Sequence, residues 1–301
     1  HWELRTYTAG ETIWWQGEPA RELALVSSGV LTVAINNSTI ATIEAPQMVG
    51  EAATFNRDFR TATVVAETDC QLLCLSIEDF LLLEESHPVL ANQLVDHALL
   101  RMARRVHEMA RKISKLAIGD EVAPTRKEES ALQSFFRRLS GANNRIPPNA
   151  DAAFRKLPLL KNADAVVLKQ IVSAGQLHHV RKGTPVFLEG ERGASVFVLV
   201  DGCIDVMRNV RGGRAETLAV LYPGAIFGTG SLLLRERRNA ACVADKATDV
   251  WVCELTQEDH AALTGEAGRV WRLSLLSALS FQLRTADDRL IRLKQGARPK
   301  Q

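Results

Sequence analysis

The chain has 301 residues, about twice the usual length of a single domain, so we expect two domains. Apolar residues make up 46% and charged residues 24%, a balance that excludes wholesale disorder. The net charge of +2 argues against a dedicated nucleic-acid or membrane-surface binder. Apolar runs such as residues 196–200 are too short to cross a membrane, so we expect no membrane partner.

The amino-terminal residue and the cysteines bear on the origin of the chain. Position 1 is His and no secretory signal follows, so we expect the sequence to start inside a longer gene product. Five cysteines are present, without the spacing of metal ligands. Cys70 and Cys74 lie in a strand-like run, roughly 13 Å apart and too far for a disulfide. We expect reduced, buried thiols in a cytoplasmic protein.

An internal repeat organises the sequence. Three glycines recur at an offset of 173 residues: Gly10, Gly17 and Gly29 match Gly183, Gly190 and Gly202. A longer turn in the second copy then shifts the offset to 178, at which Gly50 matches Gly228 and Arg60 matches Arg238. The chain therefore contains two copies of one domain type.

Each copy contains short alternating strands first and helices afterwards. Glycines at regular spacing allow tight turns, which favours a sandwich or jelly roll over a parallel sheet. Ser76 and Thr256 lie where helix N-caps are expected. The predicted fold class is α+β, mainly β, with two tandem β jelly rolls that are each followed by long amphipathic helices.

The trailing helices carry a narrow apolar stripe with a period of 3.5 residues. In the first copy it contains Leu99, Met102, Val106, Met109, Ile113 and Leu116, and in the second Leu276, Leu279, Leu283, Ala286, Leu290 and Leu293. We favour a coiled-coil seam over simple packing on the β-domain. Pairing within one chain and a homodimer both fit this pattern.

Proline, glycine and asparagine mark the division between the copies. We expect a first domain at 1–118, a linker at 119–151 with a short helix at 128–139, and a second domain at 152–301. An amphipathic helix over 152–175 leads into the second domain. Its counterpart in the first domain would precede residue 1 and is missing from this sequence.

The segment after Gly50 combines groups that suit an anion and a sugar. Gly50 and the small residues after it allow close backbone approach, and Arg60 supplies a permanent cation with forked donors. Glu51 would repel an anion but suits a sugar hydroxyl as its acceptor. An anion and a ribose hydroxyl in one small pocket describe a nucleotide.

Residues 50–64 resemble the phosphate-binding cassette of cyclic-nucleotide-binding domains, as in protein kinase A regulatory subunits and the catabolite activator protein. The resemblance implies that Glu51 binds the ribose 2′-hydroxyl and that Arg60 binds the cyclic phosphate. Gly50, Ala52, Thr61 and Ala62 would complete the phosphate shell. A Thr after the cassette Arg tilts the expectation towards cyclic GMP or dual binding, with a base-independent phosphate contact as the alternative.

The second repeat departs from this pattern. Gly228 and Arg238 remain, but Thr229 replaces the carboxylate and Asn239 follows the arginine. We therefore expect a degenerate site in which Arg238 forms a surface ion pair with Glu236 or Asp245. For the first repeat, the alternative is that Glu51 and Arg60 form a salt bridge with each other in a domain that keeps the fold but binds no ligand.

Other functional classes find less support. His178 and His179 point to opposite faces of a strand, so no metal site is expected. No nucleophile motif or Walker-type loop is present, and no room remains in this chain for a helix-turn-helix. The prediction is a non-catalytic cyclic-nucleotide sensor without cofactors, in which cAMP or cGMP bound to the first domain shifts the trailing helices. The alternative is a ligand-free or cyclic di-GMP-responsive scaffold for protein interaction.

Overall fold

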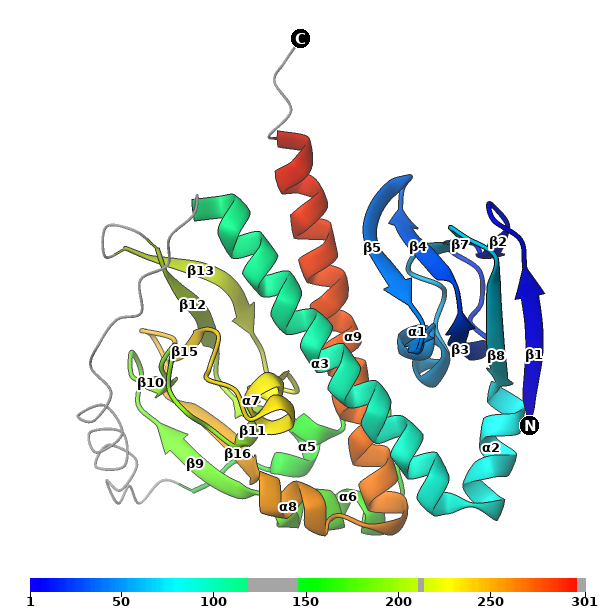
Figure 1. Ribbon diagram of the computed structural model, residues 1–301. Coiled ribbons are helices and arrows are strands. Elements are labelled where there is room, and N and C mark those ends of the chain that lie inside the picture. Colours follow the sequence, from blue (N-terminus) through cyan, green and yellow to red (C-terminus); the bar gives the residue numbers. More distant parts are fainter. Residues whose placement is uncertain (119–145, 211–213, 297–301) are drawn as a thin grey trace. The chain divides into compact units, whose positions relative to one another are not determined.

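The computed structural model describes residues 1–118, 146–210 and 214–296 (Figure 1). It contains two compact units, which do not follow the order of the chain. Unit 1 comprises residues 1–102 together with 279–301, and unit 2 comprises residues 103–278. Each trailing helix is therefore shared between the two units, and the predicted helix at 128–139 lies outside the described residues.

Unit 1 is built from two four-stranded antiparallel sheets. The first has the strand order β1-β8-β3-β6 and the second β2-β7-β4-β5. The strands are β1 Trp2–Tyr7, β2 Thr12–Trp14, β3 Glu22–Ser28, β4 Val30–Ile35, β5 Ser38–Glu44, β6 Gln47–Val49, β7 Thr63–Ala66 and β8 Cys70–Ser76. Neighbouring strands in a sheet are often distant in sequence, as expected for a jelly roll.

The hydrophobic core of unit 1 lies on the side of the strands where every second side chain is buried. Along β4, Leu31, Val33 and Ile35 are buried while the residues between them are partly exposed. These side chains pack with Leu72 and Cys74 of β8 in one apolar cluster. The turn before β4 requires Gly29, whose φ is 90° and where a Cβ would lie 2.4 Å from the Asp69 carbonyl oxygen.

Unit 1 also contains three helices, of which the first lies between β6 and β7 and the other two follow β8. They are α1 Glu51–Asn56, α2 Ile77–Ser86 and α3 Pro88–Ile118, the last of which continues into unit 2. The Ser76 side chain accepts a hydrogen bond from the Asp79 backbone N–H at 3.0 Å, which confirms the predicted N-cap of α2. Phe55 of α1 packs edge-on against Phe80 of α2 with ring centroids 4.9 Å apart.

Unit 2 repeats the two-sheet architecture, with strand orders β14-β11-β16-β9 and β10-β15-β12-β13. Its strands are β9 Gln176–Val180, β10 Pro185–Phe187, β11 Ser195–Asp201, β12 Ile204–Val210, β13 Arg214–Leu221, β14 Ile226–Phe227, β15 Ala241–Ala244 and β16 Val250–Thr256. Its helices are α5 Ala150–Phe154, α6 Ala165–Ala174, α7 Thr229–Leu234, α8 Gln257–Ala262 and α9 Gly265–Gly296, which ends in unit 1. Thr256 caps α8 as predicted.

The single helix predicted over 152–175 is wrong, because two short helices, α5 and α6, occupy this region. Pro158 lies between them. It has no backbone N–H to donate to a helical hydrogen bond, and it disfavours a helical conformation of the residue before it, so a continuous helix is interrupted here. Asp164 then caps α6 by accepting a hydrogen bond from the Val166 N–H at 2.7 Å.

Eight members of the predicted apolar stripes of α3 and α9 are buried, Val106 and Ala286 are partly buried, and the side chains of Leu116 and Leu293 lie outside the described part of the chain. Buried members are Leu99, Met102, Met109, Ile113, Leu276, Leu279, Leu283 and Leu290. Within unit 1, the Ser280 hydroxyl lies 3.8 Å from the Met102 sulfur, so the two helices meet inside one chain. No described helix combines the length and the apolar character that a bilayer span requires.

Candidate functional site

The segment predicted to bind an anion forms a sharp turn into α1. Gly50 precedes this helix with φ 84°, in the left-handed region. A Cβ at this position would lie 2.6 Å from Arg60 Nη1 and 2.9 Å from the Trp14 ring. Glycine is therefore required here both by the backbone angle and by the close approach of two large side chains.

Arg60 lies in the interior of unit 1 with 5% of its surface exposed. Its Nη2 donates a hydrogen bond to the Glu22 carbonyl oxygen at 2.7 Å. Its Nη1 donates to the Gly50 carbonyl oxygen at 3.3 Å and to the Thr54 hydroxyl at 3.4 Å. These bonds tie the cassette arginine to β3 and to both ends of the turn that begins α1.

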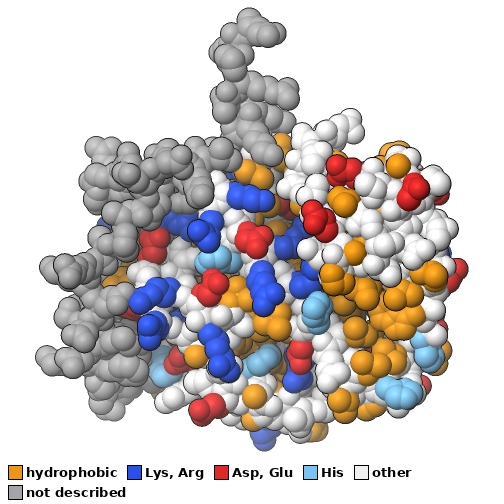
Figure 2. Space-filling model, viewed as in Figure 1, with side chains coloured by type: hydrophobic (Ala, Val, Ile, Leu, Met, Phe, Trp, Pro, Cys, Tyr) orange, Lys and Arg blue, Asp and Glu red, His pale blue; other side chains and the backbone are white. Residues whose placement is uncertain are grey.

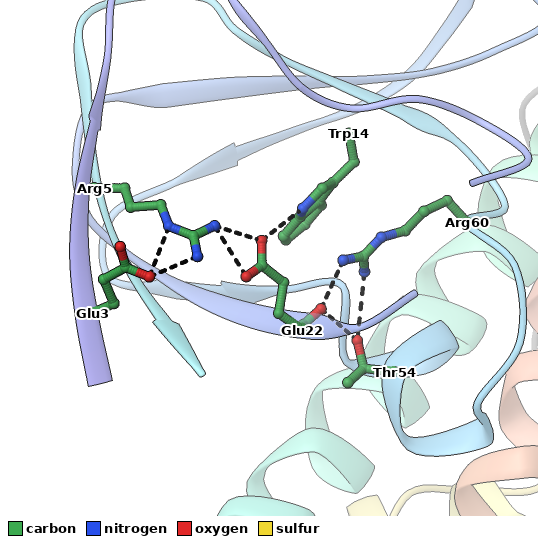
Figure 3. Close-up of polar contacts among 6 residues, drawn as sticks. All are labelled: Glu3, Arg5, Trp14, Glu22, Thr54 and Arg60. Carbon is green, nitrogen blue, oxygen red and sulfur yellow. Dashed lines mark hydrogen bonds and ion pairs between the residues drawn. The ribbon is translucent and has the colours of Figure 1, made fainter. Parts of the chain in front are cut away.

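An aromatic ring covers one face of this guanidinium. Arg60 Cζ lies 3.7 Å from the centre of the Trp14 ring, a distance typical of a cation–π contact. Trp14 Nε1 donates to the Glu22 carboxylate at 3.1 Å, and Arg5 Nη1 donates to the same carboxylate at 2.9 and 3.0 Å (Figure 3). A continuous polar network thus runs from Arg5 at the surface to Arg60 in the interior.

The guanidinium retains unused donor capacity. It carries five N–H groups, and its hydrogen bonds engage only Nη1 and Nη2. Arg60 Nε is buried and has no acceptor among the described residues. Burial lowers the pKa of Arg60 to about 10, and the carboxylates of Glu22, Glu18 and Glu51 partly offset this effect. The side chain remains a cation at neutral pH.

Glu51 is the first residue of α1 and is 1% exposed. Its Oε1 is buried, and no described group donates a hydrogen bond to it. The alternative of a mutual salt bridge is wrong in its simple form, because the described contacts include no Glu51–Arg60 ion pair within 4 Å. A buried carboxylate oxygen without a donor is costly, which makes it a natural acceptor for a ligand hydroxyl.

The remaining predicted residues lie around this pair. Ala52 is partly buried in α1, and its carbonyl oxygen accepts from Asn56 Nδ2 at 2.8 Å. Thr61 is partly buried and Ala62 is 7% exposed, both between Arg60 and the start of β7. Gly50, Glu51, Arg60 and their neighbours are thus gathered at one end of α1.

In the second repeat the expected surface ion pair of Arg238 is wrong. Arg238 is 5% exposed, and its Nη1 donates to the carbonyl oxygens of Ser195 at 2.9 Å and Gly228 at 3.0 Å. Its guanidinium carbon lies 4.2 Å from the centre of the Phe187 ring. Burial lowers its pKa to about 10. Backbone oxygens and an aromatic face replace the carboxylate partner that we expected.

The two arginines are held in the same way. Ser195 and Phe187 occupy the positions of Glu22 and Trp14 at the repeat offset of 173. Thr229, at the position of Glu51, is buried at 2% exposure and starts α7. Asn239 is exposed, and its carbonyl oxygen accepts from Arg208 Nη2 at 3.1 Å. The second site therefore keeps the arginine framework without the acidic acceptor.

A separate cavity of about 320 Å³ opens where the cassette meets α2. It is lined by Pro19, Ala20, Arg57, Asp58, Phe59, Ile77, Glu78 and Leu81. Figure 2 shows hydrophobic side chains gathered over this part of unit 1, and Phe59 and Leu82 are 59% and 52% exposed. No described group of three His, Cys, Asp or Glu side chains is placed to hold a metal ion.

Comparison with known proteins follows the same boundaries as the internal repeat. Residues 4–87 and 177–266 each match the family described as "Cyclic nucleotide-binding domain". The chain belongs to the cyclic nucleotide-binding domain family. Both cassettes fall within the matched segments, and the predicted tandem arrangement of two such domains is confirmed.

Proteins similar in sequence to this chain occur in bacteria and in eukaryotes. The cyclic AMP receptor protein of Thermus thermophilus is 35% identical over 106 residues, which cover 35% of this chain and 48% of the relative. The cGMP-dependent protein kinase 2 of Homo sapiens is 23% identical over 243 residues, which cover 80% of this chain and 25% of the kinase. The chain thus spans less than half the length of these relatives.

Solved structures give weaker matches. The catabolite activator protein of Thermus thermophilus matches with 31% identity and a TM-score of 0.40, over 46% of this chain and 63% of that one. The regulatory domain of Toxoplasma gondii PKA matches with 15% identity and a TM-score of 0.35, over 90% and 84% of the two chains.

Sequence reasoning missed the residues that hold Arg60 in place. Trp14, Glu22 and Thr54 contact the guanidinium from β2, β3 and α1. One available signal was the aromatic pair Trp14 and Phe187, which match at the offset of the repeated glycines. The acceptor role of the Glu22 and Gly50 carbonyls has no sequence signal, because any residue supplies a backbone oxygen.

Proposed function

We propose that the first repeat binds a cyclic nucleotide, cAMP or cGMP, in the cassette at residues 50–62. Arg60 contributes to the phosphate site, and Glu51 accepts a hydrogen bond from the ribose 2′-hydroxyl. The observation that supports this most directly is the buried Glu51 Oε1, which no described donor satisfies. Membership of the cyclic nucleotide-binding domain family supplies the ligand class.

The role proposed for the whole chain is regulatory and non-catalytic. Phe55 on α1 packs against Phe80 on α2, so a displacement of the cassette would move α2, the helix that follows the first barrel. The second repeat would serve as a structural partner, because Thr229 stands where the first repeat has Glu51. A nucleotide that prefers one position of these helices would shift their equilibrium by its difference in affinity.

Calorimetry with cAMP, cGMP and cyclic di-GMP tests this proposal on the 301-residue chain. We expect one nucleotide per chain for wild type, and an affinity about 10- to 100-fold weaker for Glu51→Gln, since the acceptor loses its charge and one of its two oxygens becomes a donor. Thr229→Val, at the equivalent position of the second repeat, is the matched control and should bind as wild type. Equal affinities for wild type and Glu51→Gln, or no heat with cAMP or cGMP, would refute the proposal.

A ligand-free scaffold is the second candidate, and one observation favours it. Arg60 and Arg238 are both buried, stacked on an aromatic ring and bonded to equivalent carbonyl oxygens, although the second repeat lacks the carboxylate. On this reading both arginines serve the fold. It predicts no nucleotide binding and similar losses of stability for Arg60→Ala and Arg238→Ala.

A further inference from the structure

The end of the first cassette helix is joined to the middle of α9, which runs from Gly265 to Gly296. We call residues 56–58 the cassette exit, because α1 ends at Asn56 and the chain turns at Arg57, whose φ is 51°. Asn56 Nδ2 donates a hydrogen bond to the Ser280 hydroxyl at 2.9 Å. Arg284 Nη1 donates to Asp58 Oδ2 at 2.6 Å. Ser280 and Arg284 are four residues apart and therefore share one face of α9.

The cassette side of this contact is itself tied to α1. Asn56 Nδ2 also donates to the Ala52 carbonyl oxygen at 2.8 Å. The Asp58 N–H donates to the Ala53 carbonyl oxygen at 3.0 Å, and Asp58 Oδ1 accepts from the Phe59 N–H at 2.8 Å. A displacement of α9 relative to the exit would therefore act on the backbone of α1, the helix that begins with Glu51.

Unit 2 contains an equivalent contact between a histidine and a glutamate. His107 Nδ1 on α3 lies 3.1 Å from Glu236 Oε2, just after α7. Glu236 matches Asp58 at the cassette offset of 178, and His107 matches Arg284 at the helix offset of 177. Both repeats thus place an acidic side chain at the cassette exit opposite a basic side chain on a long helix.

The residue types differ between the two pairs, but an acidic group faces a nitrogen-bearing side chain in both. In each case the helix follows the other barrel in sequence: α9 follows the second barrel and ends in unit 1, and α3 follows the first barrel and ends in unit 2. A contact that recurs at equivalent positions with different side chains is unlike an accidental surface pair. The Asn56–Ser280 hydrogen bond is specific to the first repeat. The corresponding residues of the second repeat are Leu234 and Ala103, whose side chains form no hydrogen bonds.

We infer that Ser280 and Arg284 are positioning residues for the nucleotide cassette of the first repeat. They hold the exit of α1 and thereby the position of Glu51, so a helix that begins in the second repeat sets the affinity of the first. The affinity part of this inference rests on the proposed function. By linkage, a nucleotide that fixes α1 also strengthens the contact between the exit and α9.

Hydrogen exchange on the protein without nucleotide tests the contact itself. The backbone N–H groups of Thr54, Arg57 and Asp58 are bonded within the cassette and report its opening. In Ser280→Ala/Arg284→Ala we expect them to exchange about three- to thirtyfold faster, because an ion pair and a hydrogen bond are lost. Arg284→Lys, which keeps the charge, should restore most of the protection in the presence of Ser280. Wild-type exchange rates in the double variant would overturn the inference.

Calorimetry with cAMP and cGMP then measures the effect on binding. The double variant should bind about two- to tenfold more weakly, because the cassette must be ordered on binding. Arg292→Ala, on an exposed position of the same helix, is the matched control and should bind as wild type. An unchanged or tighter affinity in the double variant, or an equal loss in the control, would overturn the positioning role. If wild type binds neither nucleotide, the proposed function fails, and the exchange rates still decide whether α9 holds the cassette exit.

Discussion

The guanidinium of Arg60 lies 3.7 Å from the centre of the Trp14 ring, and Glu22 contacts both side chains. The Glu22 carboxylate accepts from Trp14 Nε1, while its carbonyl oxygen accepts from Arg60 Nη2. One residue of β3 thus contacts both the ring and the cation. In the second repeat, Phe187 lies against Arg238 without an indole N–H, so the stacking contact does not depend on the hydrogen bond to Glu22.

Substitution of Trp14 separates these two contributions. Trp14→Phe keeps an aromatic face but loses the hydrogen bond to Glu22, and should lower the free energy of unfolding by about 1 kcal/mol. Trp14→Ala also removes a buried ring and should cost about 3–5 kcal/mol. Chemical denaturation monitored by circular dichroism measures both values. Equal losses for the two variants would show that the ring contributes little to the stability of unit 1.

Gly50 offers a test of the close approach between the cassette turn and Arg60. Gly50→Ala combines a left-handed backbone with a Cβ that would lie 2.6 Å from Arg60 Nη1. Gly10→Ala is the matched control, because Gly10 has a similar φ of 88° and no heavy atom within 4 Å of the added Cβ. We expect a loss of about 1–2 kcal/mol for Gly10→Ala from backbone strain alone. Gly50→Ala should cost about 1–3 kcal/mol more, because the added atom overpacks the interior.

Denaturant titrations of these two glycine variants provide the comparison. A loss for Gly50→Ala no larger than that for Gly10→Ala would mean that Arg60 and Trp14 move aside without cost. In that case the tight packing around the turn would not be what requires glycine at this position.

The lowered pKa of Asp58 leads us to expect that the free energy of unfolding falls at acidic pH. The Phe59 N–H, and then the Arg284 guanidinium, hold the pKa of the Asp58 carboxyl below its ordinary value of 3.8, although burial acts in the opposite direction. A carboxyl with a lower pKa in the folded state adds stability above its unfolded pKa, and this stability is lost as the pH falls through the folded value. Wild type should therefore progressively lose its advantage over Asp58→Asn as the pH falls from neutral into the acid range below the ordinary carboxyl pKa of 3.8.

Urea midpoints of wild type and Asp58→Asn across this pH range provide the measurement. In an Arg284→Ala background, the difference in stability that Asp58→Asn produces should be smaller, because one of the two groups that stabilise the charged carboxylate is absent. A constant difference between wild type and Asp58→Asn at all pH values would contradict the prediction.

The raised pKa values of three buried cysteines lead us to expect that the protein loses stability at alkaline pH. Burial raises the pKa of the Cys74 thiol to about 11 and those of Cys242 and Cys253 to about 12. Because the unfolded thiols ionise at lower pH, the stability that these groups contribute is present below pH 9 and falls as the pH rises further. The buried thiols should also resist alkylation at pH 8, since the thiolate is the reactive form.

Mass spectrometry after iodoacetamide treatment distinguishes the thiols. Cys203 is partly exposed and should be modified first, whereas Cys70, Cys74, Cys242 and Cys253 should react only after unfolding. Rapid modification of Cys242 in the folded protein would contradict the burial described for β15.

Several features could be predicted from the sequence because their causes are local. The repeated glycines mark turns that need positive φ, and Ser76 and Thr256 cap helices through side chains three residues from their partners. The residue types at positions 50–60, together with their resemblance to a known cassette, placed Glu51 and Arg60 in one predicted site. The apolar stripes of α3 and α9 were also readable, because helical periodicity repeats over short distances.

Other features depend on contacts between residues far apart in the chain. Arg238 was expected at the surface, but the carbonyl oxygens of Ser195 and Gly228 and the ring of Phe187 hold it inside. The orientation of a backbone oxygen is decided by the fold and leaves no trace in residue identity.

The sequence by itself therefore determined the two repeats, the cassette positions and the helix caps, because each depends on neighbouring residues and their backbone preferences. Only the tertiary structure placed Trp14 against Arg60 and Ser280 against Asn56, which lie 224 residues apart. The physical reason is that such contacts form when β-sheet pairing and helix packing bring distant segments together. No local preference specifies which segments will meet.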